Sequence, residues 1–251
     1  MDLGLRDRVY VVTGGTAGLG FATAQALVAD GARVVVSSRT QESVDDAVAR
    51  LGEGAVGLAA DNADPAAAAR LVDVARSAFG RLDGALVSVG GPAAGSVTGA
   101  SEEQWRTAFD AVFLGAVRLT TTVAEELGDG GSIALVLSTS VKTPIPGLAI
   151  SNGLRPGLAM VAKTLADELG PRGVRVNSLL PGRVDTDRVR RLDEQSGDAA
   201  ASRARNEASI PLGRYGTPEE FGAVAAFVLS HAAGFLTGAA IPVDGGLTRA
   251  L

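Results

Sequence analysis

The chain contains no cysteine, few aromatic residues, two lysines and one histidine. The absence of cysteine among 251 residues excludes disulfides, a thiol nucleophile and a cysteine metal site. Aromatic residues make up 4% of the chain, so its 46% hydrophobic share rests on Ala, Val and Leu, which suit helices packed closely on a sheet.

Long charged and apolar runs are also missing. The net charge is −5 and no cluster of basic residues is longer than two, which argues against a nucleic-acid or anionic-membrane partner. No apolar run reaches the length of a membrane span, and the start, MDLGLRDRVYVVTGG, does not have the pattern of a secretory signal. We therefore expect a soluble cytoplasmic protein.

Short β-branched segments alternate with longer alanine-rich amphipathic segments. Strands are predicted at 8–14, 33–38, 55–60, 84–89, 132–138, 174–180 and 239–244. Helices are predicted near 18–30, 41–51, 65–79, 101–127, 157–169 and 218–230. Continuous apolar strands separated by helices are typical of a parallel sheet covered on both faces. The sequence thus predicts an α/β fold, a single doubly wound Rossmann domain over 1–251 with a seven-stranded parallel sheet.

A polar stretch rich in Arg, Asp and Ala, 187–209, lies between the sixth strand and the last helix. A long insertion at the carboxyl end of a strand in such a sheet is a candidate substrate lid. Its charged residues fit either a cap over an acidic ligand or a solvated helical face; they are Arg188, Arg190, Arg191, Asp193 and Glu194.

The segment TGGTAGLG, 13–20, follows the first strand and opens the first helix. Glycines at 14, 18 and 20 permit a tight turn and a close approach of the backbone to a pyrophosphate at the helix N-terminus. The predicted cofactor-binding residues in this turn are Gly14, Thr16, Gly18, Leu19 and Gly20.

The ends of the second and third strands indicate which nucleotide is bound. An NAD site usually has Asp or Glu after the second strand, whereas this chain has Ser38 and Arg39. A hydroxyl and a guanidinium can hold a 2′-phosphate, so we expect NADP(H) to be preferred over NAD(H). Asp61 and Asn62, after the third strand, are suited to receive the adenine ring, although they would look the same as loop caps.

These segments resemble the short-chain dehydrogenase/reductase family over essentially the whole chain. The resemblance is carried by the glycine turn, LDGALVSVGG (82–91), RVNSLLPGRVDT (175–186), IPLGRYGTPEEF (210–221) and FLTGAAIPVDGG (235–246). It implies an NAD(P)-dependent oxidoreductase of a small-molecule substrate, with the nicotinamide lined by Pro181, Gly182 and Thr186. Gly90, in the turn after the fourth strand, is a further cofactor-binding residue.

Ordinary members of this family use a serine, a tyrosine, a lysine and an asparagine. Ser138 matches the serine, but the tyrosine position, thirteen residues later, holds Ser151. The lysine position holds Arg155, and Val112 aligns with the asparagine. Serine is a far weaker acid than tyrosine, and arginine stays charged, so we expect that Ser151 and Arg155 do not work as a tyrosine–lysine pair.

Pro156 bears on the same segment, because proline fits an α-helix only in its first turn. The sequence predicts that the helix begins near 152–155 or is distorted there, with Ser151 or Asn152 as a possible N-cap. A catalytic role for Ser151 stays open beside the capping role. Other candidates for the missing proton donor are Lys142, on the loop after the fifth strand, and a water held by Ser138; His231 is given no catalytic role.

Three functions fit these residues. The first is NADP(H)-dependent carbonyl reduction or alcohol oxidation with a non-standard proton donor. The second is a non-redox enzyme on the same fold, such as a dehydratase, isomerase or cyclase, and the third is a nucleotide-binding protein without catalysis. The resemblance also implies a homotetramer or homodimer, through small-residue faces at 108–123 (Ala108, Val112, Ala116) and 157–166 (Gly157, Ala159, Ala162, Ala166).

Overall fold

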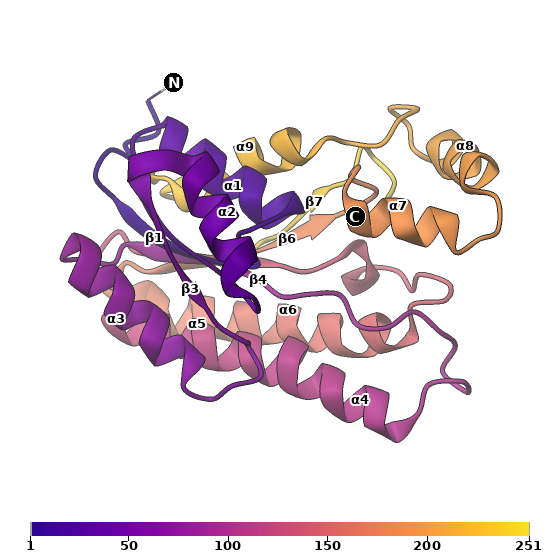
Figure 1. Ribbon diagram of the computed structural model, residues 1–251, viewed down its shortest axis with the longest axis horizontal. Coiled ribbons are helices and arrows are strands. Elements are labelled where there is room, and N and C mark those ends of the chain that lie inside the picture. Colours follow the sequence, from indigo (N-terminus) through magenta and orange to yellow (C-terminus); the bar gives the residue numbers. More distant parts are fainter. Residues whose placement is uncertain (1, 251) are drawn as a thin grey trace.

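A seven-stranded parallel sheet forms the centre of the protein (Figure 1), whose computed structural model describes residues 2–250. Its strand order is β3-β2-β1-β4-β5-β6-β7. The strands are β1 Val9–Thr13, β2 Arg33–Ser38, β3 Ala55–Ala59, β4 Gly84–Ser88, β5 Ser132–Val136, β6 Arg175–Pro181 and β7 Ala240–Val243. The predicted Rossmann-type α/β fold is confirmed.

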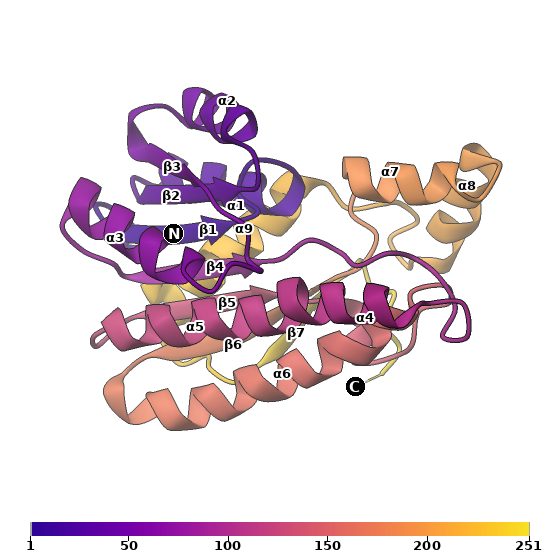
Figure 2. The same ribbon diagram turned by 60° about the horizontal axis from the view of Figure 1, so that its bottom comes forward.

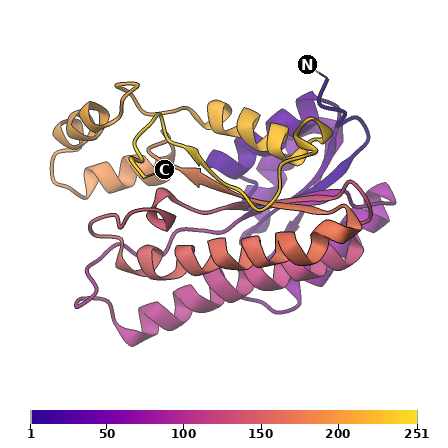
Figure 3. The same ribbon diagram turned by 180° about the vertical axis from the view of Figure 1, so that it is seen from behind.

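Helices cover both faces of this sheet (Figure 3). On one face lie α1 Gly18–Ala29, α2 Gln41–Leu51 and α9 Pro218–Leu229, and on the other lie α3 Ala67–Phe79, α5 Gly115–Glu126 and α6 Ala149–Leu169. Val11 packs into one core and Val12 into the other, both fully buried. Successive residues of a strand point to opposite faces, so a sheet covered on both sides needs the continuous apolar strands seen in the sequence.

The sheet reverses its direction of growth at β1. That strand pairs with β2 on one side, where Val11 lies opposite Val35, and with β4 on the other, where it lies opposite Ala85. In open parallel sheets a crevice forms at the carboxyl ends of the strands beside such a switch point. The predicted glycine turn, at the end of β1, lies at this point.

The helix expected over 101–127 is interrupted. It consists of α4 Glu102–Ala108, a π-helical segment Phe109–Leu114, and α5, and Ser101 begins it with a capping box to Gln104. By length and composition Glu102–Glu126 is long and apolar enough to cross a membrane, with 44% of its most apolar window buried inside the protein. It packs against the sheet as a core helix, and a core helix can have the same length and apolar composition as a membrane span.

The polar insertion folds into two helices, α7 Asp187–Glu194 and α8 Ala199–Ser209. Figure 2 shows them beyond the carboxyl ends of the strands, away from the helices that cover the sheet. Thr186 caps α7 by accepting the Val189 N–H at 3.4 Å, and Asp198 caps α8.

The predicted start of the helix that contains Pro156 is wrong. α6 begins at Ala149, and Pro156 lies in its interior, where its ring removes one backbone hydrogen bond, to the carbonyl of Asn152. Ser151 is therefore the third residue of the helix and not its cap. The loss of about 3 kcal/mol expected for an interior proline is offset by burial of the apolar side of α6, which includes Leu154 and Leu158.

The predicted subunit-contact faces are also wrong in part, because several of their residues face the protein's own core. Those buried are Ala108, Val112, Ala116, Ala162 and Ala166. The outward side of the same helices carries larger residues, including Phe109 (41% exposed) and Met160 (67% exposed).

Candidate active site

A cavity of about 1000 Å³ opens at the carboxyl ends of the strands, between the glycine turn, the ends of β4, β5 and β6, and helices α7 and α8. It brings together residues that are far apart in the sequence. The predicted site residues that line it are Gly14, Gly18, Leu19, Gly20, Gly90, Ser138, Ser151, Arg155, Pro181, Gly182 and Thr186.

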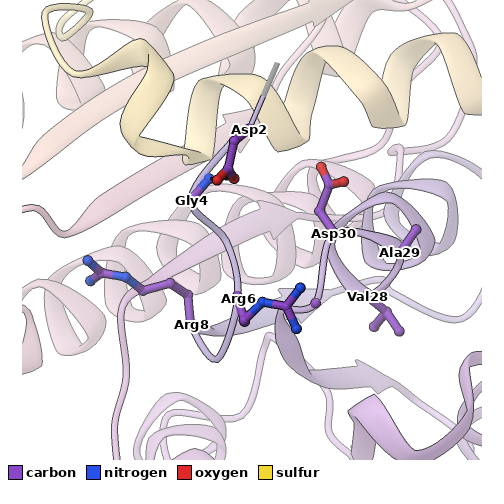
Figure 4. Close-up of a pocket in the computed structure, with 8 residues that line it drawn as sticks. Asp2, Gly4, Arg6, Arg8, Val28, Ala29 and Asp30 are labelled. Carbon is purple, nitrogen blue, oxygen red and sulfur yellow. Dashed lines mark hydrogen bonds between the residues drawn. The ribbon is translucent and has the colours of Figure 1, made fainter.

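A smaller groove of about 740 Å³ lies elsewhere, around the N-terminal segment and the end of α1 (Figure 4). Asp2, Arg6, Arg8 and Asp30 are among its lining residues, and none of the predicted site residues is. The carboxylate of Asp2 accepts the Gly4 N–H at 2.8 Å. This groove lacks the hydroxyl and glycine-turn features of the larger cavity, so the larger cavity is the candidate active site.

The glycine turn has the geometry of a phosphate cradle. Gly18 has φ +51°, a left-handed conformation that favours glycine. A Cβ on Gly20 would collide with the carbonyl of Gly14, so only glycine lets the helix lie this close to the turn. Ala17, the residue before α1, offers no side-chain cap, which leaves the first N–H groups of the helix for an anion. These residues fit the diphosphate of a dinucleotide.

Five predicted cofactor residues lie outside the lining of the cavity: Thr16, Ser38, Arg39, Asp61 and Asn62. Ser38 lies opposite Ala59 in the β2–β3 pairing, so the carboxyl ends of these two strands lie at the same end of the sheet as the glycine turn. The Arg39 side chain is exposed, which leaves its guanidinium accessible to a phosphate. Asp61 accepts the Ala63 N–H at 3.0 Å and thus shapes the turn after β3.

Three serine hydroxyls gather beside the end of β5. The Ser138 Oγ accepts the Ser140 N–H at 3.1 Å, and the Ser140 Oγ lies 3.4 Å from the Ser151 Oγ. Ser140 and Ser151 are buried, at 4% and 5% exposure, while Ser138 and Ser151 line the cavity. Ser140 therefore joins the positions of the family's serine and tyrosine, through its backbone N–H to Ser138 and through its hydroxyl to Ser151.

Arg155 is a buried cation on the same face of α6 as Ser151, one helical turn away. Its Nη1 donates to the Val136 carbonyl at 2.6 Å, and its Nη2 lies 3.4 Å from the carbonyls of Val89 and Gly90. Its Nε has no hydrogen-bond partner. Burial, and to a lesser degree the charge of Arg188, lower the pKa of Arg155 from 12.5 to about 10, so it remains charged at neutral pH.

Arg188, on helix α7 of the polar insertion, reaches across to the end of β4. Its guanidinium occupies the space that any side chain at Gly91 would need, so glycine there permits the contact. Burial, and secondarily the charge of Arg191, lower the pKa of Arg188. The sequence places Arg188 in the insertion, but only the fold shows that it reaches the β4 end.

The remaining candidate donor is not brought to the cavity. Lys142 follows the short 3-10 helix Thr139–Val141, is exposed, and is absent from the cavity lining. His231 begins the 3-10 turn after α9 and hydrogen-bonds Arg8, away from the cavity.

A buried polar network, which no sequence pattern indicates, holds the two helices of the polar insertion together. The Asp193 carboxylate is 5% exposed and accepts hydrogen bonds from the Tyr215 hydroxyl at 2.9 Å and the Ser202 hydroxyl at 3.0 Å. Asn206 donates to Asp193 at 3.2 Å and to Tyr215 at 3.1 Å. Burial, followed by the bond to Asp193, raises the pKa of Tyr215. Asp193 thus ties α7 to α8 and to the turn before α9.

The chain is similar in sequence to proteins named as reductases and oxidoreductases. The model of a family described as "Enoyl-(Acyl carrier protein) reductase" matches residues 14–248. A human protein named dehydrogenase/reductase SDR family member 4 is 37% identical over 96% of this chain and 88% of its own length. An uncharacterized oxidoreductase of Methylorubrum extorquens is 34% identical over 97% and 98% of the two chains.

A solved structure agrees over the whole fold. L-sorbose reductase from Gluconobacter frateurii, complexed with NADPH and L-sorbose, superposes with a TM-score of 0.94 and 28% identity, covering all of both chains. The match of the family model across nearly the whole chain, with these relatives, identifies the family that the glycine turn and the strand order indicate. The chain belongs to the short-chain dehydrogenase/reductase family of NAD(P)-dependent oxidoreductases.

Proposed function

We propose that this protein is an NADP(H)-dependent carbonyl reductase or alcohol dehydrogenase that works without the family's tyrosine. The observation that carries the proposal is the single cavity shared by the glycine turn, Ser138, Ser151 and Arg155. The related L-sorbose reductase was solved with NADPH, which supports this choice of cofactor. When bound, the reduced nicotinamide supplies a hydride to the carbonyl carbon, and the carbonyl oxygen takes up a proton.

The protein's own groups stabilise the charge that develops on that oxygen. Ser138 and Ser151 offer hydroxyl donors at the cavity wall, and the charge of Arg155 lies one helical turn beyond Ser151. Preorganised donors and a nearby cation act strongly in a site shielded from water. Since a serine is too weak an acid to replace a tyrosine, the proton itself comes from solvent, along the Ser140–Ser151 hydroxyl contact or through a water at Ser138.

Preference for the phosphorylated dinucleotide rests on Ser38 and Arg39. Arg39 is exposed and accessible, and no acidic side chain immediately follows β2 to repel a 2′-phosphate. Calorimetric titration should give tighter binding for NADPH than for NADH. The substitution Arg39→Ala should weaken NADPH by about ten- to a hundredfold, the usual size of a charge-assisted contact, and leave NADH almost unchanged.

A matched control is Arg106→Ala, which removes an exposed arginine whose one acidic partner within residues 2–250 is Glu102 on α4. It should alter neither titration. Tighter binding of NADH by the wild-type protein, or an equal loss of NADPH affinity in both variants, would contradict the proposed preference.

We also propose a cytoplasmic homotetramer, or at least a dimer. Its support is the outward face of the π-helical segment Phe109–Leu114 and of α6. There Phe109 stacks on Phe113 with ring centroids 5.2 Å apart, and Met160 is largely exposed. Phe235, near the C-terminal strand, is fully exposed as well. Large exposed apolar side chains of this kind mark contact surfaces. Light scattering at micromolar concentration should give a mass above that of one chain; a monomer would contradict the assembly.

A further inference from the structure

The cavity has an excess of positive charge that the proposed reaction alone does not explain. Four arginines line it, Arg155, Arg183, Arg188 and Arg191, against one acidic residue, Asp187. Asp187 pairs with Arg190, which lies outside the lining. The protein as a whole has a net charge of −5, so this concentration of positive charge is local.

Most of these positive charges have no acidic partner. Arg183 lies 3.4 Å from the Asp193 carboxylate. Within residues 2–250, none of Arg155, Arg188 and Arg191 forms an ion pair with an acidic side chain. Of these three, Arg155 is buried, Arg188 is half-buried and Arg191 is exposed at the rim. A charge removed from water is costly unless it is paired, so Arg155 and Arg188 together provide a site for an anion.

Two of the cations converge on one stretch of backbone. The Arg155 guanidinium lies at the carbonyls of Val89 and Gly90, and the Arg188 guanidinium lies against the next residue, Gly91. Arg155 is 4% exposed, and its Nε has no hydrogen-bond partner. An anion in the cavity would offset the repulsion between these two side chains.

Arg155 connects this pair of cations to the serine hydroxyls. It donates to Val136, two residues before Ser138, and shares a helical face with Ser151. The glycine turn, by contrast, offers backbone N–H groups on α1 to a diphosphate. An anion held by Arg188 above Arg155 would thus lie on the serine side of the cavity, where the substrate reacts.

We propose that the substrate carries a carboxylate close to its reacting carbon, as in a 2-oxo or 3-oxo acid or the corresponding hydroxy acid, and that Arg188 binds this carboxylate above Arg155, with Arg191 at the rim. This rests on the proposed function and adds the substrate class to it. The closed network around Asp193 keeps α7 in place, so Arg188 is presented by a positioned helix.

Binding of small acids without cofactor tests the proposal. The probes are acetoacetate against ethyl acetoacetate and pyruvate against methyl pyruvate, each titrated at constant ionic strength while the thermal unfolding midpoint is measured. A ligand that binds the folded state raises this midpoint by mass action. The acids should bind the wild-type protein at least tenfold more tightly than their neutral esters.

Arg188→Met should abolish the preference for the acids, while NADPH affinity, titrated separately, stays within threefold. Arg190→Met is the matched control, because Arg190 is on the same helix but is not among the lining residues and pairs with Asp185 and Asp187. It should keep the preference. Arg188→Lys, which retains the charge, should keep part of it and serves if the methionine variant does not fold.

Equal binding of acid and ester by the wild-type protein would overturn the proposal, as would an equal loss in the Arg190 control. If Arg188→Met weakens NADPH more than tenfold and leaves the acid preference intact, the arginine serves a cofactor phosphate and the proposal is wrong. If the wild-type protein prefers the acids but binds no NADPH, the anion site is supported and the proposed reductase function fails.

Discussion

Replacement of the buried Arg155 by methionine should leave the protein folded and nearly as stable as the wild type. Two opposing contributions decide this. A lowering of its pKa from 12.5 to about 10 by burial and by Arg188 corresponds to about 3 kcal/mol that disfavours the charged form in the folded protein. Against it stands one short hydrogen bond, to the Val136 carbonyl at 2.6 Å, of about 1.5–3 kcal/mol.

These contributions nearly cancel, since the contacts to Val89 and Gly90 are long, at 3.4 Å, and contribute little. Methionine also fills part of the volume with apolar atoms. We therefore expect Arg155→Met to change the free energy of unfolding by about 1 kcal/mol or less, although a buried arginine that holds a carboxylate usually costs about 3–5 kcal/mol to remove.

Arg175 provides a matched comparison. It is also buried, at 7% exposure, but it donates at 2.8 Å to both the Val228 and the Ser230 carbonyl, at the C-terminal end of α9. A cation is stabilising there because of the helix dipole. Arg175→Met should cost more than Arg155→Met, on the order of 2–4 kcal/mol.

Urea titrations of the wild type and the two variants, at one fixed protein concentration, measure the difference in free energy of unfolding. The difference follows from the shift of the urea midpoint, provided that the dependence of the free energy on urea concentration is unchanged. Arg155→Met could instead lower the free energy of unfolding by 3 kcal/mol or more, or by as much as Arg175→Met. Arg155 would then stabilise the fold, and its assignment as an unpaired charge that serves the active site would be refuted.

Ser138→Ala should lower turnover by about a hundredfold, the usual effect of losing a donor to a developing oxyanion, and Ser151→Ala by about tenfold. Turnover assays on an identified substrate decide this, with Lys142→Met as the unchanged control because that side chain is exposed outside the cavity. A hundredfold loss in the lysine variant instead would show that Lys142 is the donor. Burial raises the pKa of Asp83, but hydrogen bonds from two arginines and a backbone N–H outweigh this and lower it. Its stabilisation is therefore present above the unfolded pKa of about 3.9 and is lost as the pH falls toward the folded value. Asp83→Asn should cost about 1.5–3 kcal/mol at pH 7 and progressively less below pH 4 in urea titrations, and an equal cost at both pH values would contradict this.

The sequence predicts well what local patterns determine. The seven strands are continuous apolar runs, and Gly18 and Gly20 are required by backbone geometry within one short turn. Both signals arise from neighbouring residues, so they are visible without the fold. The family's serine, Ser138, follows from its fixed place after β5.

The start of α6 was not predictable in the same way. Pro156 has a large local penalty, and its local rule places it in a first turn. What offsets the penalty is packing of the helix against β6 and the core, through side chains such as Leu158. This gain depends on distant segments, so local sequence rules predict a later start for the helix than the structure has.

The charge of the cavity was the least predictable feature. Arg188 and Arg190 are two residues apart and look alike in the sequence. Arg188 reaches Gly91 at the end of β4, whereas Arg190 pairs with Asp185 and Asp187. Which of them belongs to the site depends on the rotation of one short helix, set in part by the buried carboxylate of Asp193.

Isotope labelling tests whether the protein transfers a hydride from NADPH to a carbonyl carbon. NADPH deuterated at the transferable position is incubated with the protein and a panel of oxo acids, together with their esters, and the products are weighed by mass spectrometry. We expect one deuterium at the carbinol carbon of the product from at least one oxo acid, and less deuterated product with Ser138→Ala. Binding of NADPH without deuterium in any product would contradict this expectation and favour a non-redox enzyme or a nucleotide-binding protein.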